Sequence, residues 1–112
     1  MELNIKEITV GRVVVTPSDR IDAFTAPQLR AEFDLWLARG LIHFVLDLTD
    51  VGFLDSSGLA ALVSLLKRAR QAGGDVKLIL PRAEIAQRIL KLTKFDRVFD
   101  LATTVDDALL LF

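Results

Sequence analysis

The chain of 112 residues contains no cysteine and a single histidine, and its 14 basic and 15 acidic residues leave a net charge of −1. Without cysteine it can form no disulfide framework and carry out no thiol catalysis. The near balance of charge gives no general electrostatic reason to bind nucleic acid or an anionic membrane. Its apolar runs are far too short to span a membrane, so we expect no membrane insertion. The first residues, MELNIKEI, mix charges into the apolar positions and do not form a signal peptide.

Hydrophobic residues make up 52% of the chain, which argues against disorder and is enough to build a core. A length of 112 residues corresponds to one domain. No linker, low-complexity run or internal repeat interrupts the sequence. We therefore expect one domain over residues 1–112, located in the cytoplasm.

Strand patterns alternate with helix patterns along the chain. Two β-rich pieces, Leu3–Ile8 and Arg12–Thr16, predict a hairpin that turns near Gly11, and the PSDRID segment that follows is interpreted as a loop. Further strands are predicted at LIHFVLDL and VKLIL, with a short edge strand at Val98 and Phe99. The three consecutive valines at 13–15 indicate a strand that is buried on both faces.

Four helices are predicted between these strands. The first begins at Thr25, with Gln28 placed as in a capping box, and ends at Gly40. The second runs from about Ser57 to Gln71 and ends at a pair of glycines. The third lies in RAEIAQRILKL, where the apolar positions Ile85, Ile89 and Leu92 share one face, and a short last helix begins at Thr104 with Asp107 three positions later. Strands separated by helices favour crossover connections. The fold class is therefore α/β, with a mixed, mostly parallel sheet of four to five strands and about four helices.

The segment DVGFLDSSGLAALV places Asp55, Ser56, Ser57 and Gly58 where a helix begins. Serine at this place can cap the helix by accepting a hydrogen bond from a free backbone N–H group. A hydroxyl in the first turn also lies where a phosphate is tolerated, because the N–H groups and the helix dipole favour negative charge. From the residues alone, Ser56 and Ser57 can be capping residues or modification sites, and capping is the commoner case.

Catalytic, metal-binding and nucleotide-binding functions find little support. Ser57, His43 and an aspartate could be written as a triad, but the G-x-S-x-G elbow is absent and His43 lies in an apolar strand. One histidine and scattered carboxylates provide no metal-ligand spacing. Neither glycine-rich phosphate-binding motif is present, and Asp50 and Asp55 would repel a phosphate there. We expect no enzymatic activity and no cofactor.

The stretch VLDLTDVGFLDSSGLAALVSLLKRARQAGGDVKLIL closely resembles the STAS domain family, and within it the bacterial anti-sigma factor antagonists. IDAFTAPQLRAEF resembles the start of the family's first helix, and ILKLTKFDRVFDLATTVDDAL its C-terminal part, so that the resemblance covers essentially the whole chain. It implies a single STAS-type domain. It also implies a cytoplasmic regulator that binds an anti-sigma factor, which is also a serine kinase, and thereby frees a sigma factor.

The resemblance also implies how such a regulator is switched. The kinase phosphorylates the serine directly before the glycine, which is Ser57 here, and a serine phosphatase reverses the modification. The residues that the resemblance assigns to partner binding are Asp22, Thr25, Asp55, Ser56, Ser57 and Gly58. Gly58 is expected at the surface that the partner approaches. An alternative is a STAS scaffold module of a larger assembly, such as a lipid-transport ABC complex or a stress-sensing particle, but such a module needs no phosphorylatable serine.

One segment departs from the family pattern. Family members commonly have a glycine and an acidic residue in the turn before the aspartate that corresponds to Asp22, whereas this chain has Asp19 and Arg20. The shape and charge of the loop that contacts the partner are expected to differ accordingly.

Overall fold

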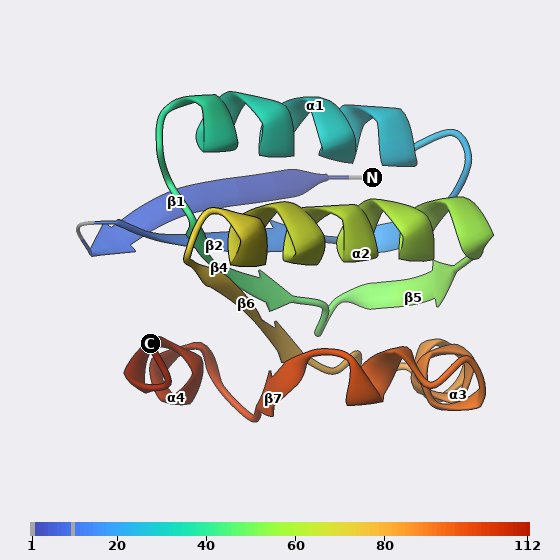
Figure 1. Ribbon diagram of the computed structural model, residues 1–112. Helices are drawn as coiled ribbons and strands as arrows, with labels where there is room; N and C mark the ends of the chain where they lie inside the picture. The colour runs from blue at the N-terminus through green and yellow to red at the C-terminus, as the bar shows by residue number, and fades with distance from the viewer. Residues whose placement is uncertain (1, 10) are drawn as a thin grey trace.

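The computed structural model describes residues 2–9 and 11–112 and has a central sheet with helices on both faces (Figure 1). The sheet contains five strands in the order β1-β2-β4-β6-β7. Their bounds are Leu3–Thr9 for β1, Arg12–Pro17 for β2, His43–Asp47 for β4, Asp75–Ile79 for β6 and Asp100–Ala102 for β7. β1 pairs with β2 in an antiparallel hairpin, and all later pairs in this sheet are parallel. The predicted fold class is therefore confirmed.

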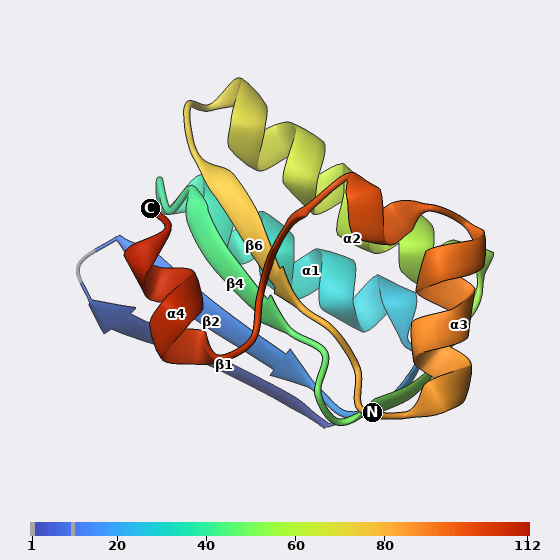
Figure 2. The ribbon, with the colours of Figure 1, turned by 90° about the horizontal axis from the view of Figure 1, so that it is seen from below.

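Two helices cover one face of the sheet and a third covers the other. α1 (Ala26–Ala38) and α2 (Ser56–Gln71) lie side by side and run in the same direction, so that both begin at the same end of the molecule (Figures 1 and 2). α4 (Val105–Leu110) lies on the opposite face, and α3 (Glu84–Leu92) stands at one end of the molecule (Figure 2). A short 3-10 helix, Phe95–Arg97, joins α3 to β7.

The three valines of β2 show how one strand contributes to the hydrophobic packing on both faces of the sheet. Val13 and Val15 are fully buried in the core that includes residues of α1 and α2, whereas Val14 belongs to the smaller cluster with Ala108 of α4. Neighbouring residues of a strand point to opposite faces, so the predicted burial of this strand on both faces is confirmed. Gly40 and Gly73, just after α1 and α2, have positive φ angles, as the predicted helix ends require.

A second, two-stranded sheet was not expected from the sequence. β3 (Asp19–Ile21) and β5 (Val51–Leu54) pair in parallel, so the interpretation of PSDRID as a loop is wrong. The backbone N–H of Asp55 donates to the carbonyl of Ile21 (3.2 Å) directly after this pair. Since α1 follows β3 and α2 follows β5, the two-stranded sheet brings the starts of both helices together.

Two local predictions in the C-terminal part are wrong. α3 buries Ala86 and Leu90, whereas Ile85 and Leu92 are 63% and 75% exposed. The edge strand is Asp100–Ala102 and not Val98–Phe99, because Phe99 is buried in the core just before the strand begins. The last helix is capped as predicted, with the N–H of Asp107 donating to Thr104 Oγ1 (3.1 Å). Within the described ranges, no helix is long and apolar enough to cross a membrane.

Candidate functional site

Asp55, and neither serine, caps α2. Its side chain accepts a hydrogen bond from the backbone N–H of Gly58 (Oδ1 to N, 3.0 Å), and the helix begins at Ser56. The interpretation of Ser56 or Ser57 as the capping residue is therefore wrong. Because an aspartate already fills the capping position, capping explains neither serine.

The two serines line an open depression between the starts of α1 and α2. Ser56 is exposed and Ser57 is partly buried. The depression has a volume of about 360 Å³. Besides the serines it is lined by one basic residue, Arg30, and by the small apolar residues Ala23, Ala26, Pro27 and Ala60. The serine segment singled out in the sequence thus forms one wall of the depression. The sequence could not indicate that α1 provides the other wall.

Asp55 also holds the two walls together. Its second carboxylate oxygen, Oδ2, accepts a hydrogen bond from the backbone N–H of Ala23 (3.1 Å), in the loop before α1. One side chain thus caps α2 and fixes the start of α1. Since both oxygens are used within the protein, the role of Asp55 in this structure is to shape the depression.

Asp22 is buried, with 7% of its surface exposed, and it organises the loop before α1. Its Oδ1 accepts hydrogen bonds from the N–H groups of Phe24 (3.0 Å) and Thr25 (3.1 Å), and its Oδ2 lies 2.7 Å from Arg20 Nε. Burial alone would raise the pKa of Asp22, but the bonds from Thr25 and Phe24 and the positive charge of Arg20 outweigh it and lower that pKa. Asp22 is therefore a buried residue that stabilises the conformation of this loop.

The predicted capping box at α1 is absent. The Thr25 side chain accepts no hydrogen bond from the first turn of α1. Its hydroxyl instead accepts a hydrogen bond from the N–H of Asp22 (2.9 Å) and donates to the carbonyl of Arg20 (3.0 Å). The side chains of Thr25 and Asp22 thus each accept a hydrogen bond from the other residue's backbone N–H. Thr25 precedes α1 as predicted, but it does not form the predicted capping bonds.

Gly58 does not lie at the surface, where we expected it from the sequence. It is buried, and a Cβ atom built on it would lie 2.1 Å from the carbonyl oxygen of Ile21. The first turn of α2 therefore packs directly against the end of β3, and only glycine fits this close approach.

The departure from the family pattern at Asp19 has a structural consequence. Asp19 has a φ angle of +65°, a left-handed conformation that favours glycine but that aspartate tolerates. Arg20 follows with its guanidinium 5.1 Å from the ring centre of Phe53, and it pairs with Asp22. The positive charge of Arg20 is therefore partly neutralised within the protein.

Sequence reasoning missed Phe24, which is 93% exposed beside the depression. Its backbone N–H is bonded to Asp22, so the loop holds the residue while the ring meets solvent. An exposed aromatic side chain on an ordered loop is a frequent anchor in protein interfaces. The only sequence signal was an apolar residue in a polar loop.

The possible triad is not assembled. Ile42, next to His43, lies against Gly74 just beyond the last turn of α2, whereas Ser57 is in the first turn. A helix of 16 residues separates these positions by about 24 Å. The His43 ring instead packs edge-on against Phe112, 5.1 Å between ring centres. Among residues 2–9 and 11–112, no group of three or more potential ligands could hold a metal ion.

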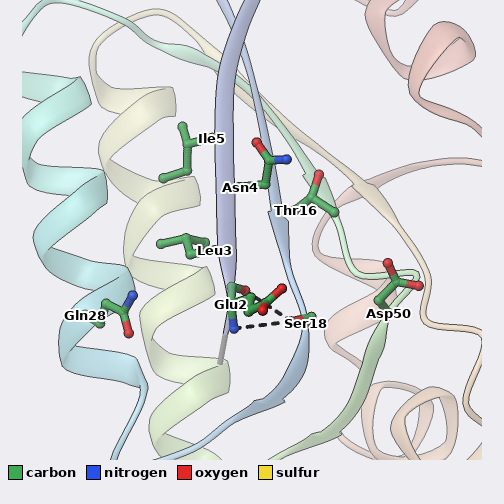
Figure 3. A pocket seen from close by; sticks show the side chains of 8 residues that line it. All are labelled: Glu2, Leu3, Asn4, Ile5, Thr16, Ser18, Gln28 and Asp50. Carbon is green, nitrogen blue, oxygen red and sulfur yellow. Dashed lines mark hydrogen bonds between the residues drawn. The ribbon is translucent and has the colours of Figure 1, made fainter.

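A larger open pocket of about 750 Å³ lies elsewhere, between the hairpin and the first turn of α1 (Figure 3). The N–H of Glu2 donates to Ser18 Oγ (3.2 Å) at its rim, as Figure 3 shows. Its two charged residues, Glu2 and Asp50, are both acidic. This pocket therefore offers no cation to an anionic ligand, and it contains neither of the predicted serines.

Comparisons with known proteins agree with this geometry. The family model described as "STAS domain" matches residues 4–108. The anti-sigma-F factor antagonist RsfB of Mycobacterium tuberculosis is 31% identical over 100 residues, which are 88% of this chain and 80% of that protein. The crystal structure of an anti-sigma factor antagonist from Mycobacterium paratuberculosis has a TM-score of 0.84 at 31% identity and covers 98% of this chain and 92% of its own. Bacillus SpoIIAA in its phosphorylated form shares the fold, with a TM-score of 0.71 at 17% identity and 96% of each chain covered.

The matched family model spans nearly all of the chain. The chain therefore belongs to the STAS domain family. The two mycobacterial relatives, each 31% identical to the chain over most of its length, carry the name anti-sigma factor antagonist.

Proposed function

We propose that this protein is an anti-sigma factor antagonist, a cytoplasmic binding protein without catalysis of its own. The observation that carries the proposal is the pair of hydroxyls in the first turn of α2. Asp55 already caps the helix, so these serines have no capping role, and they lie in an open depression beside the exposed ring of Phe24. The names of the relatives support the same function.

The proposed partner is an anti-sigma factor with serine kinase activity, and the proposed modification site is Ser57. Phe24, Ser56 and Ser57 contribute surface to the interface, whereas Asp22, Thr25, Asp55 and Gly58 maintain its shape from within. The phosphorylated form of SpoIIAA supports a modification in this fold. A serine phosphatase would restore the unmodified state.

Phosphorylation is expected to act on the interface and to leave the fold intact. A phosphate adds about −1.5 to −2 charges, and the first turn of a helix tolerates an anion. Once a partner covers the depression, the phosphate loses its water, and removing an ion from water costs several kcal/mol. A penalty of about 3 kcal/mol weakens binding roughly a hundredfold.

The test is to identify the protein that co-purifies from the native host with the parent chain and with serine variants. We expect an ATP-binding serine kinase with the parent and with Ser57→Ala, and at least tenfold less of it with Ser57→Asp. After incubation with that kinase and ATP, mass spectrometry should find phosphate on the parent and on Ser56→Ala, but none on Ser57→Ala.

Two results would contradict the proposal. Phosphate on Ser56 with Ser57 unmodified would refute the site. Capture of a permease and an ATPase, with neither serine modified, would instead favour the STAS scaffold module of a larger assembly. Circular dichroism spectra that match the parent are the control that each variant is folded.

A further inference from the structure

Arg30 is the one basic residue that lines the serine depression. Ala26, Pro27 and Arg30 of α1, with Ala23 in the loop before it, form one wall. Ser56, Ser57 and Ala60 form the facing wall on α2. Side chains of a helix lean toward its N-terminus. Because α1 and α2 run in the same direction (Figure 1), Arg30 leans toward the end at which the serines lie.

Arg30 has no partner within the described part of the chain. Its guanidinium forms no ion pair there, unlike Arg20, Arg68, Arg70, Arg82 and Arg88. No aromatic ring covers it either, unlike Arg12 and Arg39. An exposed guanidinium with its donors free can bind a phosphate with two parallel hydrogen bonds.

The depression also has room for a phosphate and needs a cation to hold one. Apart from the serines and Arg30, its walls are alanines and a proline, whose small side chains leave an open volume of about 360 Å³. Asp55 is adjacent in sequence to the serines, and its negative charge would repel a phosphate that had no counter-charge.

From this juxtaposition we propose that Arg30 is the cation that pairs with a phosphate on Ser57. The inference rests on the proposed function, because it concerns the phosphorylated state of the same site. Arg30 holds the modified side chain against the protein's own surface. The phosphorylated form therefore stays folded. The phosphate occupies a fixed position in the depression, where an approaching partner meets its negative charge.

The test uses the full chain with phosphoserine incorporated at position 57 during translation, so that no kinase is required. Phosphorus NMR follows the second ionisation of the phosphate, whose ordinary pKa is about 6. We expect Arg30→Gln to raise this pKa by about half a unit to one unit, because the dianion loses a neighbouring positive charge. Arg30→Lys should retain most of the effect of the arginine.

A matched control is Lys67→Gln, which removes one positive charge from an exposed position of α2 outside the depression. Its phosphate should titrate as in the parent. The difference between the parent and Arg30→Gln should also shrink in about 1 M salt, where the screening length is about 3 Å.

Equal phosphate pKa values in the parent and in Arg30→Gln would overturn the ion pair, as would an equal rise in Lys67→Gln. Neither result would affect the proposed function. Conversely, if the cognate kinase left Ser57 unmodified, the proposed function would fail. The titration would still test whether Arg30 pairs with a phosphate at position 57.

Discussion

Gly58 is the residue at which the first turn of α2 packs against the carbonyl of Ile21, at the end of β3. A Cβ atom there would lie 2.1 Å from the carbonyl oxygen of Ile21, and that oxygen already accepts the N–H of Asp55. The carbonyl cannot move away without breaking this bond. The structure therefore requires glycine at position 58 for packing, independently of any partner.

We expect Gly58→Ala to destabilise the protein by roughly 1–3 kcal/mol, because the backbone must shift to admit the methyl group. The change would otherwise favour the helix by about 1 kcal/mol. Gly52→Ala is the matched control, since a Cβ at Gly52 meets its nearest atom at an ordinary 3.5 Å. Urea unfolding measures both free energies, and Gly58→Ala as stable as the parent would contradict the packing role. Gly58→Glu should be less stable still, so a loss of partner binding in that variant would not by itself assign Gly58 to the interface.

At the scale of elements, α1 and α2 are positioned by one carboxylate. Asp55 accepts the N–H of Gly58 with one oxygen and the N–H of Ala23 with the other. A simple cap has only the first of these bonds, as at Thr104 of α4. Removing Asp55 should therefore cost more than removing an ordinary cap.

We expect Asp55→Ala to lower the free energy of unfolding by about 2 kcal/mol or more, against about 1 kcal/mol for the control Thr104→Ala. Asp55→Ser should recover the cap but not the bond to Ala23. Hydrogen exchange at the Ala23 amide separates the two roles: it should accelerate in both Asp55 variants. Unchanged exchange at Ala23 in Asp55→Ser would show that the second bond contributes nothing.

The element order could be predicted because long segments with clear periodicity bury one face, as in α1 and α2. The β3–β5 pair could not, because its strands have three and four residues and each forms its hydrogen bonds with a segment distant in sequence. For α3, Ile85 and Leu92 fit the helical spacing, but the core has room for Ala86 and Leu90 instead. Tertiary packing determines which face of α3 is buried, and the sequence pattern alone could not indicate it.

Only part of the candidate site could be predicted from the sequence, because here too tertiary packing decides the outcome. Three consecutive residues, Asp55, Ser56 and Ser57, can each cap a helix, and the end of β5 decides among them. Arg30 and Phe24 acquire their places only when β3 and β5 bring the two helix starts together. No local pattern in the sequence indicates that meeting.

At the scale of the whole molecule, buried or partly buried charges tie elements together at two places. Asp22 and Arg20 hold the loop before α1. At the other place, Lys77 of β6 is only 6% exposed, and its Nζ lies 3.0 Å from Asp75 Oδ2 and 2.8 Å from Asp100 Oδ2. The second contact joins the edge strand β7 to β6.

The pKa values of three of these groups are shifted by their surroundings. Burial alone would raise the pKa of Asp75, but hydrogen bonds from Lys77, Val76 and Arg70 lower it overall. Burial alone would lower the pKa of Lys77, but its bonds to Asp100 and Asp75 raise it. The pKa of Asp22 is also lowered. Folding therefore favours the charged form of all three groups.

These directions predict where stability depends on pH. Asp22 and Asp75 stabilise the fold above their ordinary pKa of 3.8, and this contribution is lost as the pH falls below that value. Lys77 stabilises it below its ordinary pKa of 10.5, and its contribution is lost as the pH rises above that value. We expect Asp22→Asn and Asp75→Asn to have a lower Tm than the parent at pH 7, with a difference that narrows below about pH 4. For Lys77→Met the difference should narrow above about pH 10.5 instead. Calorimetric scans from pH 2.5 to 11 measure these differences, and a difference that stays constant over the whole range would show that the charge on these groups does not contribute to stability.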